Sequence, residues 1–396
     1  MDEFHLLEPK LSMATSLGMI KLLKNLCRVC IMTATLTDDY IQFIKKELDF
    51  EVVSIKDFPD DIKRINSLKP AIGKFIKKSI SVIIDKKINI HDILSNHKNK
   101  TIVICNRVET AQNIYSELEN NKSKETTLLC IHSRYFDTDR KNKELQISEY
   151  FGKHSSLKDV ILVSTQVIEA GMDISCDTMH SEISPINSLL QRAGRCARFE
   201  NEYGDIFIYD VLNLEDREKI AIDSEDTNDK KEIQKLNNKY LPYSKELCEN
   251  SLKELSKYSF IDEKNALELV NLVLKEEENH RIDCITSKLY NLEKIKDSWN
   301  DCNMSHYRET IRDIQSIEIV LIDLENYENK RIIPWMYETV SVYKWSFISW
   351  AKQVEENKID PDDWIYAQVV YGDDSVFDFE WQEKNLTYLQ RLPFEK

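Results

Sequence analysis

The sequence of 396 residues predicts an α/β protein built on a mainly parallel sheet. Short runs rich in β-branched residues alternate with helical patterns between residues 100 and 212. This alternation is typical of a parallel sheet, because a helix must carry the chain back before the next parallel strand begins. The composition is that of a globular protein, with 42% hydrophobic and 31% charged residues.

The central unit, residues 100–212, contains the clearest elements. We predict strands in four segments: KTIVICN (100–106), TTLLCIHS (126–133), DVILVST (159–165) and GDIFIYDV (204–211). Helical spacing predicts a helix over 108–120, a polar helix that runs to about 150, and the onset of a helix in INSLLQRAGRCAR (186–198).

The flanking segments are less regular. Residues 1–60 resemble the end of another α/β domain, and RVCIMTATL (28–36) is long enough for a buried strand. The next segment, 61–99, is predicted to connect the two units and to become helical. The charged segment 213–240 is predicted to be a linker. Residues 241–396 predict a mostly helical domain with one β-like run at 317–324.

The net charge of −15 is unevenly distributed. Residues 1–200 hold 29 basic and 27 acidic side chains, so 29 − 27 = +2, and the remainder accounts for −17. A near-neutral half can still hold a nucleic-acid strand in a locally basic groove. There is no signal-peptide pattern and no apolar run of about 20 residues, and the nine cysteines lack disulfide-framework spacing. We therefore expect a cytoplasmic protein without a membrane span.

The motif LLQRAGRCAR carries the strongest functional signal. If the helix continues through it, Arg195 and Arg198 lie on one face, because positions i and i+3 are neighbours. Two guanidinium groups on one face can bind a γ-phosphate and its developing negative charge. Gln191, one turn earlier, can reach the same phosphate or the attacking water.

A second motif, STQVIEAGMDIS, lies upstream. Thr165 ends a predicted strand, where its hydroxyl can bind a backbone phosphate. The turn containing Gly171 and Asp173 follows, and a loop carboxylate can bind a ribose hydroxyl.

The first residues of the chain form a third motif, DEFH. Asp2 would hold Mg²⁺ through a water molecule, and Glu3 would polarise the attacking water. The motif TATL (33–36), with Thr33 and Thr35, supplies a loop that would couple the ATP site to the strand path.

The motifs DEFH, TATL, VICNRVETA, IHSR, STQVIEAGMD and PINSLLQRAGRCAR together resemble superfamily 2 DExH helicases, and more narrowly the CRISPR-associated helicase-nuclease of type I systems. The resemblance implies an ATP-driven motor that moves 3′ to 5′ on single-stranded DNA, with ATP and Mg²⁺ as cofactors and a CRISPR surveillance complex as partner. It also implies that Arg107 and Ser133 join Thr165 in binding DNA. In this family, residues 1–60 would be a remnant of the first RecA-like domain, 100–212 the complete second one, and 241–396 the C-terminal accessory domain.

The sequence departs from the family in two respects. No two of the seven glycines lie five apart, so the GxxxxGK[ST] loop is absent, and His91-Asp92 is the only HD pair. We therefore expect a C-terminal portion that does not hydrolyse ATP as an isolated chain, and leave open a separate polypeptide that carries the missing loop and nuclease. A different superfamily 2 DNA helicase, or an inactive adaptor that binds a surveillance complex, is the alternative.

Overall fold

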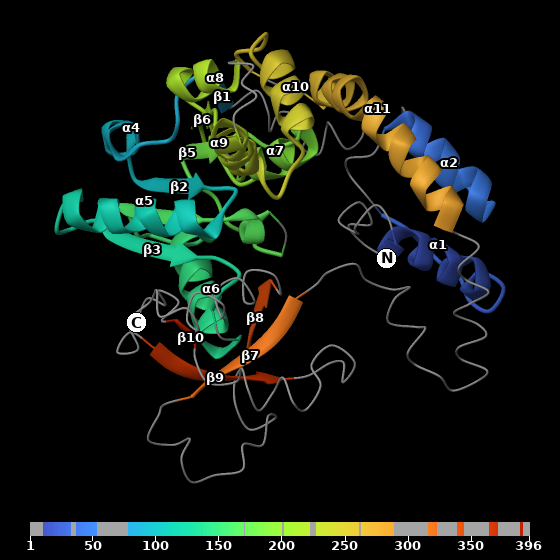
Figure 1. Cartoon of the computed structure of the whole chain (residues 1–396), viewed down its shortest axis with the longest axis horizontal. Helices are drawn as coiled ribbons and strands as arrows, with labels where there is room; N and C mark the ends of the chain where they lie inside the picture. Colours follow the sequence, from blue (N-terminus) through green and yellow to red (C-terminus); the bar gives the residue numbers. More distant parts are fainter. Residues whose placement is uncertain are drawn as a thin grey trace.

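The structure is a computed structural model. It describes residues 11–32, 37–53, 78–135, 137–169, 171–199, 202–221, 227–260, 263–288, 316–322, 339–343, 364–370 and 389–390. Figure 1 shows the central sheet with its helices, a pair of N-terminal helices to one side, and a second, smaller sheet.

The central sheet has six parallel strands in the order β1-β6-β5-β2-β4-β3. The strands are β1 (Lys78–Ile83), β2 (Lys100–Ile104), β3 (Thr127–Ile131), β4 (Val160–Ser164), β5 (Thr178–Glu182) and β6 (Gly204–Tyr209). The α/β fold and the four predicted strands are confirmed. The sequence did not predict β5, because TMHSE has no apolar run, although all five of its residues are buried between neighbouring strands.

The first strand, β1, changes the predicted domain boundary. It lies within 61–99, which was predicted to be only a connecting segment, and it pairs in parallel with β6 from Lys78 to Ile83. The sheet therefore begins about 20 residues before position 100. Of this segment, only α4 (Ile90–Asn96) has the expected helical structure in the described residues.

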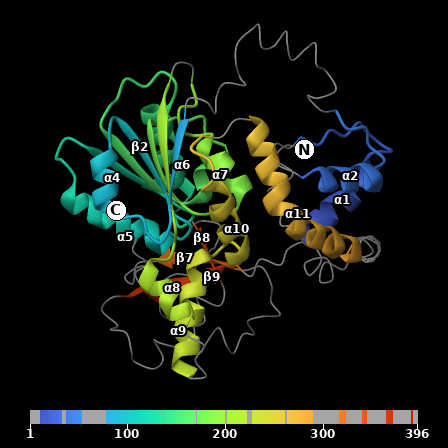
Figure 2. The ribbon, with the colours of Figure 1, turned by 90° about the horizontal axis from the view of Figure 1, so that it is seen from above.

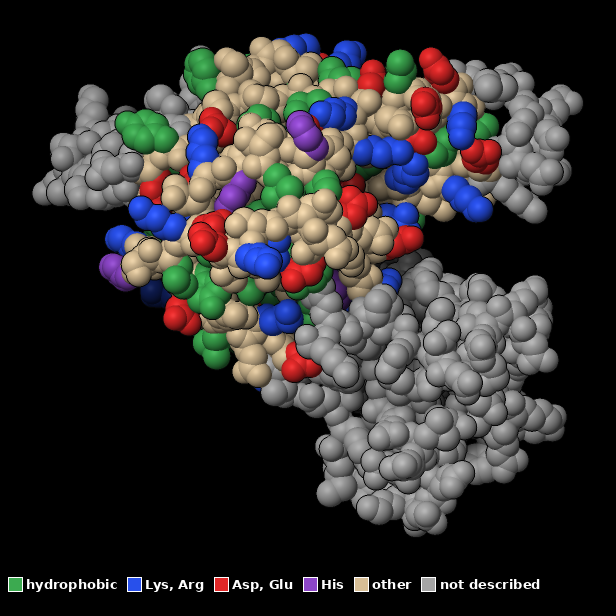
Figure 3. All heavy atoms as spheres, turned by 90° about the vertical axis from the view of Figure 1, so that its left-hand side faces the viewer, with side chains coloured by type: hydrophobic (Ala, Val, Ile, Leu, Met, Phe, Trp, Pro, Cys, Tyr) green, Lys and Arg blue, Asp and Glu red, His purple; other side chains and the backbone are tan. Residues whose placement is uncertain are grey.

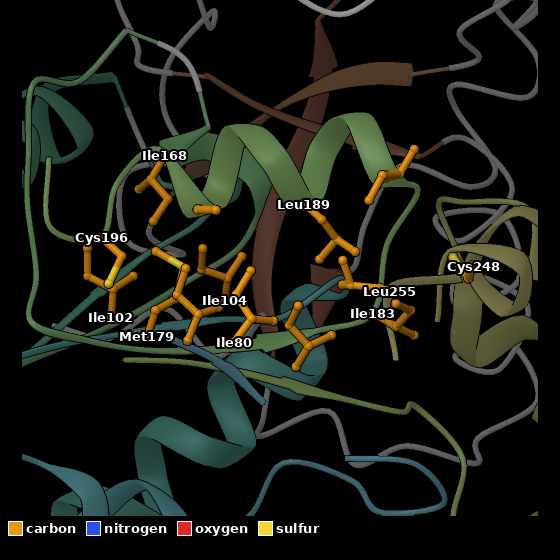
Figure 4. Close-up of a cluster of buried hydrophobic side chains, with 14 of the residues drawn as sticks. Ile80, Ile102, Ile104, Ile168, Met179, Ile183, Leu189, Cys196, Cys248 and Leu255 are labelled. Carbon is orange, nitrogen blue, oxygen red and sulfur yellow. The ribbon is translucent and has the colours of Figure 1, made fainter. Parts of the chain in front are cut away.

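Helices cover both faces of the sheet (Figure 2). On one face, α4 and α5 (Val108–Asn121) pack on Val103 and its neighbours. On the other face, α6 (Asp137–Phe151) and α7 (Ile186–Ala193) pack on Ile102 and Ile104. Consecutive residues of β2 thus point into different cores, as the period of two in a strand requires. Figure 4 shows the second of these cores.

The predicted linker, 213–240, contains helices in its described residues. It forms α8 (Leu214–Ala221), α9 (Thr227–Asn237) and the short η5 (Asn238–Tyr240), and it buries Leu236 and Tyr240 in the same core as α7. Two further helices follow, α10 (Lys245–Leu255) and α11 (Glu263–Lys288), and both contribute to this core. The segment therefore packs on the sheet domain instead of separating it from the next one.

The N-terminal helices α1 (Leu11–Leu23) and α2 (Asp38–Leu48) form a separate core with the C-terminal half of α11. The predicted strand over 28–36 is wrong for residues 28–32, which have no regular structure. None of the described strands pairs with this run, and Met32 is 53% exposed. An apolar run can form a strand only where a neighbour satisfies its backbone groups.

The C-terminal region contributes a four-stranded antiparallel sheet in the order β10-β9-β7-β8. Its strands are β7 (Ser316–Ile322), β8 (Thr339–Tyr343), β9 (Trp364–Val370) and β10 (Leu389–Gln390). The β-like run predicted at 317–324 corresponds to β7. Among the described residues, no helix is long and apolar enough to cross a membrane.

Candidate nucleotide and nucleic-acid site

The arginine motif lies at the end of α7. This helix ends at Ala193, with Gly194 as its C-cap, so Arg195 and Arg198 do not share a helical turn. The predicted common helix face is therefore wrong. Instead, Ala197 adopts a left-handed conformation with φ of 43°, and the backbone turns between the two arginines.

Arg192 belongs to the same motif, has no role predicted from the sequence, and is wholly buried. Its Nε donates to Glu169 at 2.7 Å, and its two terminal nitrogens donate to four more acceptors. These are the Ser181 hydroxyl, the Glu182 carbonyl, the Asn106 side-chain carbonyl and the Tyr243 hydroxyl, at 2.9–3.1 Å. Burial alone would lower the pKa of Arg192, but the nearby Tyr243 and Glu169 raise it above its ordinary value. The side chain is therefore a permanent buried cation that ties α7 to β5 and to the end of β2.

Arg195 is also buried, with 8% of its surface exposed. Its Nε donates to the Ile168 carbonyl at 3.0 Å, and a terminal nitrogen donates to the Glu169 carbonyl. The guanidinium group thus holds the backbone of η4 (Gln166–Ile168), the short helix that follows β4. Its bonds join the two motifs that the sequence singled out.

Arg198 is the accessible arginine of the motif. Its side chain is 34% exposed, and Nε pairs with Asp173 at 2.5 Å. Asp173 itself is 70% exposed, so it can turn away without leaving a buried charge. The backbone of Arg198 is fixed independently of this pair, because its N–H donates to the Ser175 hydroxyl at 2.9 Å. This arrangement presents a cation on a rigid backbone with an exchangeable partner.

Gly171 and Gln191 complete the predicted nucleotide-binding set. Gly171 has φ of 81°, a left-handed conformation that favours glycine, and open space surrounds the position that a Cβ would occupy. Gln191 is half-buried on the last turn of α7. The loop containing Gly171 and the end of α7 are brought together by an isolated parallel β-bridge, a backbone pairing between Cys176 and Cys196. Both cysteines are free thiols.

The three predicted DNA-binding residues lie at one edge of the sheet. Arg107, Ser133 and Thr165 follow the carboxyl ends of β2, β3 and β4, which are adjacent strands. Ser133 is exposed and Arg107 is partly exposed, whereas Thr165 is 2% exposed. The accessible groups at this edge are therefore Arg107 and Ser133.

The Asp173–Arg198 pair lies toward the opposite edge. Asp177, four residues after Asp173, donates its N–H at 3.0 Å to the carbonyl of Lys100, the first residue of β2. The helix α7 runs between the two edges, since it begins just after β5 ends and it ends next to this pair. The helix α7 thus spans the distance between the candidate nucleotide-binding pair, Asp173 and Arg198, and the edge that carries the candidate DNA-binding residues.

His132 directly precedes Ser133 at the carboxyl edge of the sheet. It is 1% exposed and stacks on Tyr135, with ring centroids 4.5 Å apart. Burial, followed by the charges of Arg134 and Lys143, lowers the pKa of His132 to about 4. The ring is therefore neutral at pH 7, and its Nδ1 accepts the backbone N–H of Arg134 at 3.1 Å. It shapes the loop that presents Ser133.

Four predicted residues lie outside the described ones: Asp2 and Glu3 of the DEFH motif, and Thr33 and Thr35 of TATL. The predicted Mg²⁺ ligand, Asp2, is among them. In the part of the chain that the structure describes, no three His, Cys, Asp or Glu side chains gather as a metal site would require.

The surface charge fits the near-neutral balance of the first 200 residues. On the face shown in Figure 3, basic and acidic side chains are interspersed. The buried charge of Arg192 is paired with that of Glu169. A signal for this buried pair existed in the sequence, since Glu169 and Arg192 lie within the two strongest motifs.

The fold and the motifs resemble those of helicase-type α/β domains. Residues 97–201 match the family model described as "CRISPR-associated nuclease/helicase Cas3, C-terminal". The CRISPR-associated nuclease/helicase Cas3 of Methanothermobacter thermautotrophicus is 29% identical over 177 residues, which are 43% of this chain and 20% of that protein. The endonuclease/helicase Cas3 of Escherichia coli is 32% identical over 111 residues, 28% of this chain and 12% of that protein.

Solved structures agree in fold. The T. fusca Cas3-ATP structure matches with a TM-score of 0.55 and 18% identity. The matched region covers 80% of this chain and 41% of the T. fusca chain. A chain in the structure described as "CRISPR RNA-guided surveillance complex, pre-nicking" has a TM-score of 0.52 and 19% identity, and covers 72% of this chain and 40% of that chain. The resemblance to the C-terminal portion of the CRISPR-associated helicase-nuclease is thereby confirmed. This chain spans about a fifth of the length of the first two curated relatives it matches.

Proposed function

We propose that this chain supplies the second RecA-like part of an ATP-dependent motor that moves 3′ to 5′ on single-stranded DNA in CRISPR interference. The observation that carries the proposal is the Arg198–Asp173 pair, in which a partly exposed guanidinium on a fixed backbone has a partner that can leave. An arginine finger needs this combination, because it must bind a phosphate only when the cleft is closed.

The residues present fit a nucleotide. Arg198 would exchange Asp173 for the γ-phosphate, and the released carboxylate would be free to bind a ribose hydroxyl. Arg195 would act mainly by holding η4, since its guanidinium is occupied by two backbone carbonyls. ATP supplies the phosphoryl group whose transfer drives movement. Gln191 would orient the attacking water, and Asp2 and Glu3 would hold Mg²⁺ and polarise that water.

The carboxyl edge of the sheet supports the part of the proposal that concerns single-stranded DNA. Arg107 and Ser133 would bind the backbone of a single strand at the carboxyl edge of the sheet, with Thr165 beneath them. Arg107 now pairs with Glu109 at 2.8 Å, and both side chains are exposed enough to separate. Such a partly exposed pair contributes about 1 kcal/mol or less, so a phosphate can displace the carboxylate.

The partners in the proposal are single-stranded DNA, a CRISPR surveillance complex, and a separate polypeptide that carries the Walker A loop and the HD nuclease. No GxxxxGK[ST] loop occurs in this sequence, so the motor would need that loop from residues outside it, and a separate polypeptide is one source. Thr33 and Thr35 would couple the cleft between the two RecA-like parts of the motor to the path of the strand.

The proposal is tested by reconstitution. The chain is co-expressed with a polypeptide that carries the Walker A loop, and ATP hydrolysis is measured with and without single-stranded DNA. Turnover stimulated by DNA is expected, and Arg198→Ala should lower it by about 10³-fold or more, as the loss of an arginine finger does. Arg140→Ala is the matched control, because Arg140 pairs with Glu144 on the surface of α6.

Each outcome discriminates between functions. If the complex hydrolyses ATP and Arg198→Ala leaves the rate unchanged, the assignment of the arginine finger is wrong. If the chain binds a surveillance complex but no mixture hydrolyses ATP, the adaptor function replaces the motor. If turnover occurs but depends on double-stranded DNA, with no binding to a surveillance complex, a different superfamily 2 motor is the better description.

A further inference from the structure

The helix α11 joins two parts of the molecule that the sequence analysis treated as separate. Its 26 residues span about 39 Å at 1.5 Å per residue. The first half packs on the sheet domain through Leu269, Val270 and Val273, whereas Ile285 in the second half packs on α1 and α2. Figures 1 and 2 both show α11 lying along α2.

A buried carboxylate, that of Glu278, lies within the apolar stripe of this helix. Buried residues recur at 266, 269, 270, 273 and 274, a spacing that places them on one face. Glu278 continues the stripe and is 4% exposed, and Ile282 and Ile285 lie beyond it. A carboxylate at such a position costs free energy unless hydrogen bonds compensate it.

The compensation comes from the start of α2. The Thr37 backbone N–H donates to Glu278 Oε2 at 3.1 Å, and the Thr37 hydroxyl donates to the same oxygen. The next residue, Asp38, donates its N–H to the side-chain carbonyl of Asn271 at 3.0 Å. Two side chains of α11 therefore satisfy N–H groups that α2 cannot satisfy within its own turns.

The charge of Glu278 strengthens this attachment. The amino end of a helix carries a partial positive charge, so an anion is stabilised there. The two hydrogen bonds from the backbone and the side chain of Thr37 also fix the orientation of α2 on α11, which apolar packing alone does not. The pair of Lys275 and Asp39, 3.7 Å apart and exposed on both sides, contributes little beside it.

We propose that Glu278 is a positioning residue that holds α2, and with it the end of the predicted coupling segment, on α11. Thr37 directly follows the TATL motif, so the residue that Glu278 binds is the next one after 33–36. Since α11 is also anchored in the core of the sheet domain, the contact links Thr37, the residue after the coupling motif, to that domain. The role in coupling rests on the proposed function, whereas the positioning of α2 does not.

The positioning is tested by hydrogen exchange on the full chain, followed by mass spectrometry. Glu278→Ala should make the amides of 37–48 exchange at least about tenfold faster, because two bonds to a charged group are lost. Peptides from β2 and β4 should be unchanged. Glu278→Gln keeps an acceptor oxygen and should restore most of the protection. The matched control is Glu276→Ala, since Glu276 is exposed on the same helix.

The coupling is tested in the reconstituted mixture. Glu278→Ala should lower the stimulation of ATP turnover by DNA about tenfold and leave the KM for ATP within twofold, and Glu278→Gln should restore the stimulation. Unchanged exchange in 37–48 overturns the positioning whatever the turnover shows. Faster exchange with unchanged stimulation overturns the coupling. If the unsubstituted mixture does not hydrolyse ATP, the proposed function fails, and the exchange result alone decides whether Glu278 positions α2.

Discussion

Replacing Arg192 by Met should destabilise the protein more than the same substitution at any exposed arginine. The Arg192 side chain is fully buried and donates to five acceptors, including the carboxylate of Glu169 at 2.7 Å. Met fills a similar volume but leaves Glu169 as a buried charge without its cation. Removing one member of a buried ion pair costs about 3–5 kcal/mol. With a urea m-value of about 2 kcal/mol/M, the unfolding midpoint should fall by about 2 M.

The assay is urea unfolding followed by far-UV circular dichroism. The control is Arg140→Met, which removes one partner of an exposed pair on α6 and should cost about 0.5 kcal/mol or less. Adding Glu169→Leu to Arg192→Met should recover part of the loss, because the uncompensated charge is then gone. A fall of less than about 0.5 M for Arg192→Met, equal to the control, would refute the view that the pair organises this site.

Three further predictions concern pH, backbone space and DNA. Burial lowers the pKa of His132 and of His180, a buried residue of β5, to about 4, below the ordinary 6.5. The stabilising contribution of each neutral ring is therefore complete above pH 6.5 and is lost as the pH falls toward 4. Between pH 7 and pH 5 each histidine should lower the free energy of unfolding by about 2 kcal/mol, which is measurable as a falling melting temperature. A melting temperature that does not change over this pH range would contradict the prediction. Gly204→Ala should cost about 2 kcal/mol, because its Cβ would overlap the sulfur of Cys196. In Gly171→Ala the added Cβ meets open space, so this variant should cost only the backbone strain of about 1 kcal/mol. Equal unfolding midpoints in urea for the two variants would disprove the clash at Gly204. Arg107→Ala should weaken single-stranded DNA binding and reduce the slope of log affinity against log salt by about 0.7, as measured by fluorescence anisotropy. An unchanged slope would exclude a phosphate contact at this position.

The sequence predicted the elements whose signal is local. Each of the four predicted strands contains a run of apolar residues, and in β2 and β4 all of these apolar residues are buried. The motifs fixed which residues to consider, and Arg107, Ser133 and Thr165 each follow the carboxyl end of a predicted strand. Residue order is enough for this, because parallel strands align their carboxyl ends at one edge.

Only the tertiary structure decided which side chains are accessible. Arg192, Arg195 and Arg198 are equivalent in the sequence, yet the first is fully buried, the second holds two carbonyls, and the third remains 34% exposed. Their difference depends on where α7 ends and on acceptors that lie 10 to 86 positions away in the chain. Burial of a charge depends on such distant partners, which no local pattern contains.

The same reason explains β5 and Glu278. The segment TMHSE becomes a central strand because β2 and β6 supply its hydrogen bonds on both sides. Glu278 is buried because Thr37, 241 positions earlier, supplies two donors. The sequence by itself determined the α/β pattern and the motifs, because these depend on neighbours along the chain. The tertiary structure decided which polar groups are buried and which are presented, because that depends on partners brought together only by folding.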